Sequence, residues 1–441
     1  MSGSSRGFGT VLRNRPFLFL WMAQAISQVA QNGANLVQIV LIETLTHSSG
    51  QIALMVLAFS LPAALLSLIA GVVVDRVSNR LILIASNVLR ALFTLGYLAA
   101  YHWLFDWSAL LVIYLLTFVN SAIGQFFAPA EAATIPALVN RQGLLSANAL
   151  FNLTMTIAQV IGLVLLFPLI VKFGNTIAPH FGIDIAFVLI VVMYLLATLL
   201  VLALPPDHHR FHPNQSTSLA QTLRDIRDGW RFVHATPAIY MPILHLTTVA
   251  MLVMVLVTIG PGFASRVLAL SPEDAIYIFG PAGIGMLIST VGIGRFGHRF
   301  LRDQLSTIGE AALSVVLAGL AAVGWASSAP DMAAFNLTFT PIVMLLAFLL
   351  GISLALIAVP AQTSLQERSP VELRGRVFAL LYTLTSLVVI VPLLFIGALA
   401  DRIGIPVVSL LIALLTLVVA LYSLTRTRHV GEFAVGDLSE P

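Results

Sequence analysis

The chain has 441 residues, of which 59% are hydrophobic and only 9% are charged, and its formal net charge is +3. A soluble globular domain carries roughly 25% charged residues, and a soluble chain this apolar would aggregate, so the composition predicts that lipid is the solvent for most of the chain. The absence of cysteine excludes disulfides and thiol chemistry, and the lone lysine, Lys172, lies outside any phosphate-binding loop pattern, so energy from a gradient is expected rather than from ATP.

The chain begins with a short, polar and basic segment, residues 1–15. The apolar run after it has no small-residue cleavage site, so we expect a retained first helix and not a cleaved signal peptide. A helix needs roughly 20 apolar residues to cross the hydrocarbon core. Twelve such windows are predicted, in two sets of six: 17–41, 52–74, 81–101, 108–128, 147–171 and 184–204, then 238–261, 275–294, 305–327, 335–359, 377–399 and 405–424.

The distribution of positive charge predicts the orientation of these spans. With the N-terminus in the cytoplasm, 18 of the 22 Lys and Arg residues fall in cytoplasmic segments. Three fall in outer loops, namely Lys172, Arg266 and Arg402, and Arg90 lies inside a span. Because positive flanks stay in the cytoplasm, both termini are expected there, which also supports an even number of spans.

The first predicted helix carries an unusual number of amides. Gln24, Gln28, Gln31, Asn35 and Gln38 recur at intervals of four, three, four and three residues, so they form one stripe along the helix. Hydrocarbon offers these groups no hydrogen-bond partner, and the stripe is therefore expected to face protein or water. Two interpretations stay open: contact with a polar cavity, or amide pairing between helices.

The segment after the second helix combines Gly71, Asp75, Arg76 and Arg80. Glycine lets helices approach closely, the aspartate can accept hydrogen bonds from a helix N-terminus, and the arginines can bridge to acids or lipid phosphates. We interpret the four residues as a latch that closes the cytoplasmic face. The alternative, anchoring by positive charge alone, explains the arginines but not the aspartate.

Arg90 falls near the middle of the third predicted helix, where a charged side chain costs about 3 kcal/mol or more. It can bind an anionic group of a substrate or a counter-acid, or it can form a structural ion pair. No acid is predicted at a comparable depth in the first half. Glu43, near the outer end of the first helix, is the acid considered as a partner.

The longest polar stretch, residues 205–237, separates the two sets of spans on the predicted cytoplasmic side. Apolar residues from Leu219 to Val233 recur there at helical spacing, which predicts an amphipathic helix on the membrane surface or against the bundle. We interpret it as a strut, with the docking of a soluble partner as the alternative. The three histidines between 208 and 212 have no acidic or cysteine neighbours and indicate a solvated loop, not a metal site.

Three residues are candidates for proton uptake and release: His245 in the seventh predicted helix, Glu310 in the first turns of the ninth, and Glu43. Histidine qualifies because its ordinary pKa is near neutrality. A hydrogen-bonded packing role is the favoured alternative for His245, and Glu310 can instead lie at the wet cytoplasmic end of its helix.

Two short patterns recur between the halves. Arg76 and Arg80 have counterparts at Arg295 and Arg299, each displaced by 219 residues (295 − 76 and 299 − 80). The pair Pro129-Ala130 has a counterpart at Pro360-Ala361. Internal repeats of this kind are how many secondary carriers are built.

Together these residues resemble the major facilitator superfamily of secondary transporters, in particular its drug-efflux-like branch of macrolide and siderophore exporters. The family's loop pattern G-x-L-A-D-R-x-G-R-R/K is matched at Gly71, Asp75, Arg76 and Arg80, and the segment from Leu365 to Val377 adds to the likeness. Departures occur at residues 78–79 of the loop and in helix five, which keeps only the first glycine, at 162, of the usual glycine-proline pattern.

The resemblance implies an all-α membrane protein of 12 transmembrane helices in two pseudo-symmetric six-helix bundles. The bundles would span residues 1–204 and 238–424, with a cytoplasmic linker at 205–237 and a tail at 425–441. In the family's fold the first helix lines the central cavity. The substrate site is therefore expected at Gln24, Gln28, Gln31, Asn35, Gln38 and Arg90.

The expected function is secondary active transport, with export of a small amphipathic organic molecule by alternating access and protons as the candidate coupling ion. We expect a monomer in the cell membrane, surrounded by lipids, with no cofactor, no metal and no nucleic-acid partner. A lipid- or lysolipid-flipping carrier is one alternative, and a non-transporting receptor or a membrane-embedded enzyme is another. An enzyme should show clustered acids and histidines or a nucleophile with its base, which the spans lack.

Overall fold

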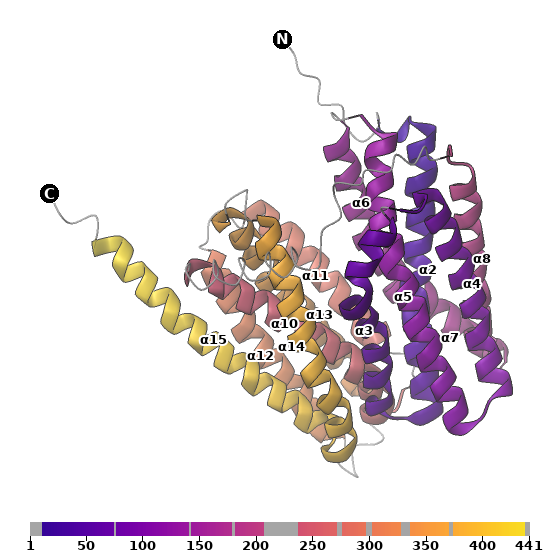
Figure 1. The fold of residues 1–441 in the computed structure, drawn as a ribbon. Helices are drawn as coiled ribbons and strands as arrows, with labels where there is room; N and C mark the ends of the chain where they lie inside the picture. The colour runs from indigo at the N-terminus through magenta and orange to yellow at the C-terminus, as the bar shows by residue number, and fades with distance from the viewer. Residues whose placement is uncertain are drawn as a thin grey trace. The chain divides into compact units, whose positions relative to one another are not determined.

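The computed structural model describes residues 11–74, 76–140, 143–178, 181–206, 237–270, 276–296, 302–327, 336–369 and 374–436. All regular structure in these ranges is helical (Figure 1). Helices dominate because a spanning segment must satisfy its backbone hydrogen bonds internally where no water is available. The predicted amphipathic helix and histidines of the linker lie outside the described residues.

The chain divides into two compact units. The first contains residues Met1–Leu45 and Leu54–Leu219, and the second contains Thr46–Ala53 and Ala220–Pro441. The short segment Thr46–Ala53, which connects two helices of the first unit, is thus grouped with the second. The domain boundaries expected from the sequence stay predictions.

The first unit contains six helical rods in its described part. α2 and α3 are followed by α4 and α5, then by a rod in which α6 and α7 are joined through a π-helical turn, and finally by α8. Their bounds are Arg15–Thr46 (α2), Ser49–Val74 (α3), Asn79–Trp103 (α4), Asp106–Leu138 (α5), Leu144–Gln159 (α6), Val160–Leu166 (the π-helical turn), Phe167–Ile177 (α7) and Phe181–Leu202 (α8).

The second unit also contains six rods in its described part. The first of them, α10, continues into a π-helical turn. Their bounds are Pro237–Gly262 (α10), Phe263–Val267 (the π-helical turn), Ile276–Phe296 (α11), Arg302–Ser327 (α12), Asn336–Arg368 (α13), Arg374–Ile403 (α14) and Ile405–Gly436 (α15).

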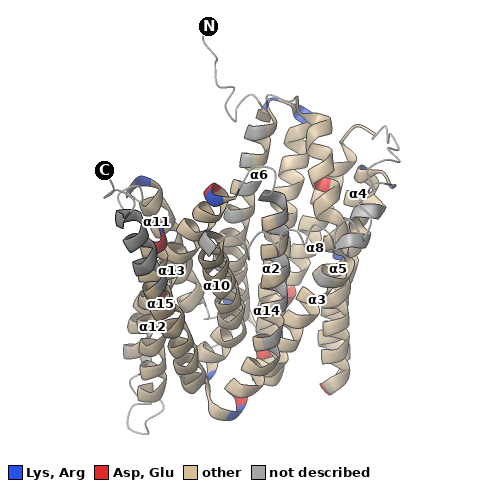
Figure 2. Ribbon diagram, turned by 60° about the vertical axis from the view of Figure 1, so that its left-hand side comes forward, with Lys and Arg blue, Asp and Glu red and all other residues tan. Residues whose placement is uncertain are grey.

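The described helices have the length and composition of membrane spans. Nine segments, each of at least 19 residues, are apolar enough to cross a bilayer. Leu111, Val291 and Val315 are 69–72% exposed, which a soluble protein avoids over a large area but lipid accommodates. Figure 2 shows the charged residues mostly toward the helix ends. The molecule is therefore a multi-pass membrane protein.

Small residues set the closest helix contacts. In the first unit, a Cβ atom on Gly162 would lie 2.7 Å from the carbonyl oxygen of Val29 and 2.8 Å from Cβ of Asn32, so α2 passes directly against the π-helical turn. In the second unit, Gly285 of α11 and Gly351 of α13 each face backbone of the other helix. Such contacts replace hydrophobic burial as the source of packing energy in lipid. The glycine at position 162, noted in the fifth predicted helix, therefore lies in the π-helical turn and packs against α2.

Candidate functional site: polar and charged clusters inside each unit

The amide stripe of α2 lies where α4, α5 and α8 can reach it. Gln24 and Gln38 are buried, whereas Gln28, Gln31 and Asn35 are partly exposed. The stripe therefore has two buried ends and a partly exposed middle. This distinction could not be read from the sequence, where all five amides follow the same spacing.

Gln31 is the best-connected residue of the exposed middle. Its Nε2 donates to Oδ1 of Asn35 at 3.2 Å, and its Oε1 accepts from the hydroxyl of Tyr194 on α8 at 3.3 Å. At the buried end, Oε1 of Gln38 accepts from Thr117 at 3.0 Å, and Thr117 in turn accepts from Tyr97 at 3.2 Å. Pairing between helices thus accounts for Gln38, and Gln31 is positioned by both α2 and α8.

The other buried end holds polar atoms without protein partners. Neither side-chain atom of Gln24 has a hydrogen-bond partner among the described residues, and the same holds for Nδ2 of Asn87. Oδ1 of Asn87 accepts from Ser27 at 2.9 Å, which joins α4 to α2. Buried polar groups in native proteins are almost always satisfied, so we expect ordered water at this end of the stripe.

Arg90 is enclosed by aromatic rings and one acid. It is 6% exposed, and its guanidinium carbon lies 5.1 Å from the ring centre of Phe127 and 5.9 Å from that of Tyr194. Glu131 on α5, which is 4% exposed, interacts with it electrostatically. A Cβ atom on Gly124 would lie 2.8 Å from Nη2 of Arg90, so the absence of a side chain there makes room for the guanidinium.

The expectation that no acid lies near the depth of Arg90 is wrong, because Glu131 does. Phe127 and Glu131 follow Gly124 by three and seven residues, so these three positions occupy one face of α5. That spacing was a usable signal, but the predicted span ended at residue 128, before the acid. The acid that interacts electrostatically with Arg90 is Glu131 and not Glu43, which is fully buried near the C-terminal end of α2.

The structure describes only part of the predicted latch. Asp75 lies outside the described residues, and Gly71 belongs to the last turns of α3. Arg80 donates from Nη2 to the carbonyl oxygen of Leu202 at 2.6 Å, at the C-terminal end of α8, where a cation is favourable. Arg76 is exposed. The latch role stays a prediction.

The second unit brings two of the three candidate proton-binding residues together. Nδ1 of His245 on α10 lies 2.8 Å from Oε1 of Glu310 on α12, and the two side chains are 1% and 0% exposed. Nε2 of the same imidazole lies 3.5 Å from Oγ of Ser423 on α15. The expectation that Glu310 could lie at a wet helix end does not hold in this structure.

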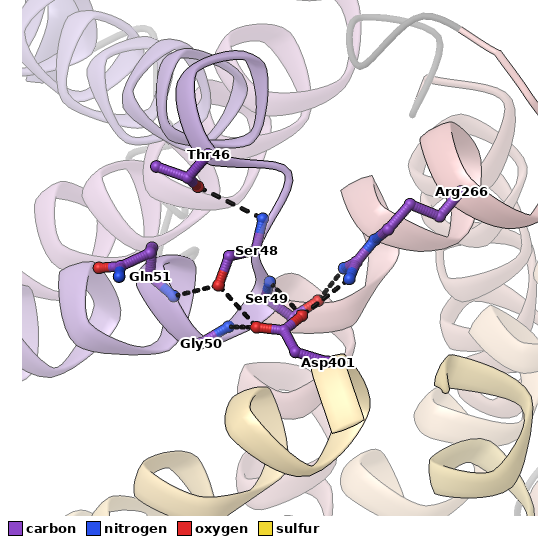
Figure 3. A network of polar contacts seen from close by, with 7 residues as sticks. All are labelled: Thr46, Ser48, Ser49, Gly50, Gln51, Arg266 and Asp401. Atoms are coloured by element: carbon purple, nitrogen blue, oxygen red, sulfur yellow. Dashed lines mark hydrogen bonds and ion pairs between the residues drawn. The ribbon is translucent and has the colours of Figure 1, made fainter. Parts of the chain in front are cut away.

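A second cluster of the same unit surrounds Asp401 in the last turn of α14 (Figure 3). Its carboxylate accepts from the hydroxyl of Ser48 at 2.6 Å and from the backbone N–H groups of Ser49 and Gly50 at 2.9 Å each. Nη1 of Arg266 donates to it at 2.7 Å. The carboxylate therefore caps the start of α3 and ties Thr46–Ala53 to the rest of the unit.

Hydrogen bonding sets the protonation of Asp401, which lies beyond the predicted span at 377–399. Partial burial by itself raises the pKa of this carboxyl, but the hydrogen bonds from Ser48, Gly50, Arg266 and Ser49 outweigh it and hold the pKa below its ordinary value. The sequence placed Arg266 and Arg402 in outer loops but did not predict this cluster, whose members come from three distant segments.

No group of three or more His, Asp or Glu residues suited to a metal ion occurs in the described ranges. Residues 20–340 match the family model described as the Major Facilitator Superfamily. The chain belongs to this superfamily. The match covers well over half of the chain and fits the architecture of two units with six helical rods each.

Curated relatives of this chain include an MFS-type transporter and an exporter. The chain is 24% identical over 375 residues to an uncharacterized MFS-type transporter, YfiS, of Bacillus subtilis (strain 168), covering 84% of this chain and 83% of the relative. It is 27% identical over 356 residues to the enterobactin exporter EntS of Escherichia coli O1:K1 / APEC, covering 76% of this chain and 80% of the relative.

Solved structures confirm the predicted fold class. The nucleoside transporter NupG superposes with a TM-score of 0.69 at 14% identity, covering 93% of this chain and 98% of that one. A bacterial homologue of the iron transporter ferroportin, in an inward-facing state, gives 0.68 at 16% identity, with 93% and 98% coverage. The protein therefore has the major facilitator fold. Its membership of the superfamily, together with the transporters among its relatives, makes it a transporter of small molecules and not an enzyme.

Proposed function

We propose that this protein exports a small amphipathic organic molecule across the cell membrane by alternating access, as a monomer with both termini in the cytoplasm. The observation that carries the proposal is the partly exposed middle of the α2 stripe, Gln28, Gln31 and Asn35, attached through Tyr194 to the buried Arg90. The 27% identity to an exporter supports the direction of transport.

The stripe suits a substrate with mixed polarity. Each amide offers both donors and acceptors, so it can bind hydroxyl, carbonyl and amine groups alike. Gln31 is oriented on both sides, by Asn35 and by Tyr194, which fixes its free hydrogen-bonding directions in advance. We assign Arg90 a positioning role through Tyr194, and its permanent charge also favours substrates that carry an anionic group.

Transport in proteoliposomes tests the function. Purified protein is reconstituted, and uptake and efflux of radiolabelled enterobactin, of ethidium and of a fluorescent lysophospholipid are measured with and without an imposed pH gradient. Export of enterobactin or ethidium by protein-containing vesicles, above empty ones, is the expected result. Movement of the lysophospholipid alone would replace the proposal with lipid flipping, and movement of none of the three would remove it.

Replacing Gln31 with leucine tests the site. The change keeps the size of the side chain but removes its bonds to Asn35 and Tyr194, so we expect transport at low substrate concentration to fall about tenfold or more, the effect of roughly 1.4 kcal/mol. Gln125→Leu is the matched control, because Gln125 bonds only locally to the backbone of Ser121. Equal transport by both variants, at normal yield and melting temperature, would contradict the assignment.

The orientation can be measured directly. Because the natural chain has no cysteine, single cysteines can be introduced without a background of native thiols. We expect a cysteine in the linker 205–237 to react with a membrane-impermeant maleimide only in inside-out vesicles. Labelling of that cysteine in intact cells would reverse the proposed topology.

A further inference from the structure

The pair formed by His245 and Glu310 is sealed inside the second unit. Its members come from α10 and α12, with an imidazole-to-carboxylate distance of 2.8 Å and almost no exposed surface on either side chain. Ser423 on α15 lies beside the other imidazole nitrogen and bonds to Thr307 at 2.6 Å. Three helices that are far apart in sequence thus converge on one titratable pair.

The pair is not fully satisfied in this arrangement. Oε2 of Glu310 is buried and has no hydrogen-bond partner among the described residues. If the imidazole is neutral and the carboxylate ionised, the pair carries one uncompensated negative charge in an apolar interior, which is costly. One added proton makes the pair neutral overall, whether it resides on the imidazole or on the carboxyl group. The two residues therefore bind that proton as a unit.

The charged groups described on α12 and α13 do not neutralise the pair. Arg302 and Asp303, two turns before Glu310 on α12, form ion pairs with Glu367 and Arg368 of α13. Within the described residues, the only ion pair of Glu310 is the one with His245.

The other titratable side chains that the structure describes on the packed helices lie away from the pair. Tyr240 on α10 and Tyr422 on α15 are 48% and 37% exposed. At the end of α14, Asp401 is paired with Arg266, which follows α10, and Arg402 is exposed. None of these described side chains therefore neutralises the pair.

We propose that His245 and Glu310 form the proton-binding site that couples transport to the proton gradient. This inference rests on the proposed export function and names its coupling ion. In this structure the pair is closed to water. In the coupled cycle it takes one proton from water on the outside, when α10 or α12 moves to admit it, and releases the same proton to the cytoplasm. The substrate moves in the opposite direction.

The decisive variant is Glu310→Gln, which keeps the shape and a hydrogen bond to the imidazole but cannot take up the proton. Potentiometric titration of purified protein in detergent counts the protons bound across the pH range in which the protein stays folded. We expect the variant to bind one proton fewer than the wild type. Asp303→Asn, which removes an acid from the same helix outside the pair, should bind as many protons as the wild type.

Transport gives the second readout. With enterobactin and ethidium as probes, we expect Glu310→Gln to lose accumulation driven by a pH gradient at least tenfold, while exchange of labelled for unlabelled probe without a gradient stays within about twofold. Asp303→Asn should keep both. A merely structural role would lower both activities together.

Two outcomes would overturn the inference. One is an unchanged number of bound protons in Glu310→Gln. The other is gradient-driven accumulation that survives in this variant with an unchanged ratio of protons to probe. If that variant does not fold, His245→Gln is measured with the same expectations. Failure of the proposed function looks different, since then no probe moves in wild-type vesicles while the titration still shows whether the extra proton binds.

Discussion

The electrostatic interaction between the buried side chains of Arg90 and Glu131 allows a quantitative test of how the first unit is stabilised. Arg90→Met removes the guanidinium but keeps an unbranched, apolar side chain of useful length. It leaves Glu131, 4% exposed, without its counter-charge. Arg90 and Glu131 interact electrostatically but form no direct ion pair in the described structure, so the loss stays below the roughly 3 to 5 kcal/mol of a broken buried ion pair. The contacts with Phe127 and Tyr194 add about 0.5 to 2 kcal/mol each.

The double variant Arg90→Met with Glu131→Gln separates these contributions. It removes the stranded charge, so only the contacts with the aromatic rings are lost, and apolar or neutral replacements of a buried ion pair are often close to neutral. We therefore expect the double variant to be more stable than Arg90→Met by about 1.4 kcal/mol, roughly a tenfold change in the folding equilibrium. The free energy of unfolding in mixed micelles, followed by tryptophan fluorescence, measures this difference.

The control for this cycle is Arg402→Met, the same substitution at an exposed position. It should change the free energy of unfolding by no more than about 0.5 kcal/mol. If the losses from the two single substitutions at Arg90 and Glu131 simply add in the double variant, the two charges are not coupled, and the account of Arg90 given above is wrong.

Two further predictions concern single positions. Gly162→Leu should sharply reduce the yield of folded protein, because its Cβ atom would lie 2.7 Å from the backbone carbonyl oxygen of Val29 on α2. Gly292→Leu is the control and should keep the yield, because a Cβ atom there would meet no neighbouring atom within 4 Å. Equal yields of the two variants would contradict the close packing at Gly162. Asp401→Asn should speed hydrogen exchange at the backbone amides of Ser49 and Gly50, measured by mass spectrometry against the wild type. Because the pKa of Asp401 is lowered, its hydrogen bonds are present at any pH above its ordinary pKa near 4 and are lost only as the pH falls through the lowered value. The difference in exchange rate between the variant and the wild type should therefore be constant from about pH 8 to about pH 5. A difference that fades already near pH 6 would refute this.

The sequence predicted which polar residues share one face of a helix better than it predicted where helices end. Amide spacing on α2 correctly placed one stripe on one helix, because periodicity follows directly from helical geometry. Whether an amide pairs or stays partly exposed depends on what another helix presents, such as Thr117 to Gln38 or Tyr194 to Gln31. That information lies more than 70 residues away in the chain.

Prolines explain why two of the predicted helices ended too early. The predicted fourth span stopped at residue 128, before Pro129, and the predicted tenth stopped at 359, before Pro360. In the structure α5 continues to Leu138 and α13 to Arg368, each with two prolines inside the helix. Proline ends helices in water, but membrane helices tolerate it because neighbouring groups satisfy the freed carbonyls. Glu131 was consequently missed as a partner for Arg90.

The two units hold their buried charge in different ways, and this difference carries a functional consequence. The cation of the first unit is an arginine, which stays protonated at any physiological pH, so the guanidinium of Arg90 presents a fixed positive charge to the residues around it. The cation of the second unit is a histidine, which can be charged or neutral, so the charge of the His245–Glu310 pair changes with one proton. A fixed charge suits recognition of a substrate, and a variable charge suits coupling to a gradient. Substitutions in the first pair should therefore change which compounds are transported, whereas substitutions in the second should change how transport depends on the proton gradient.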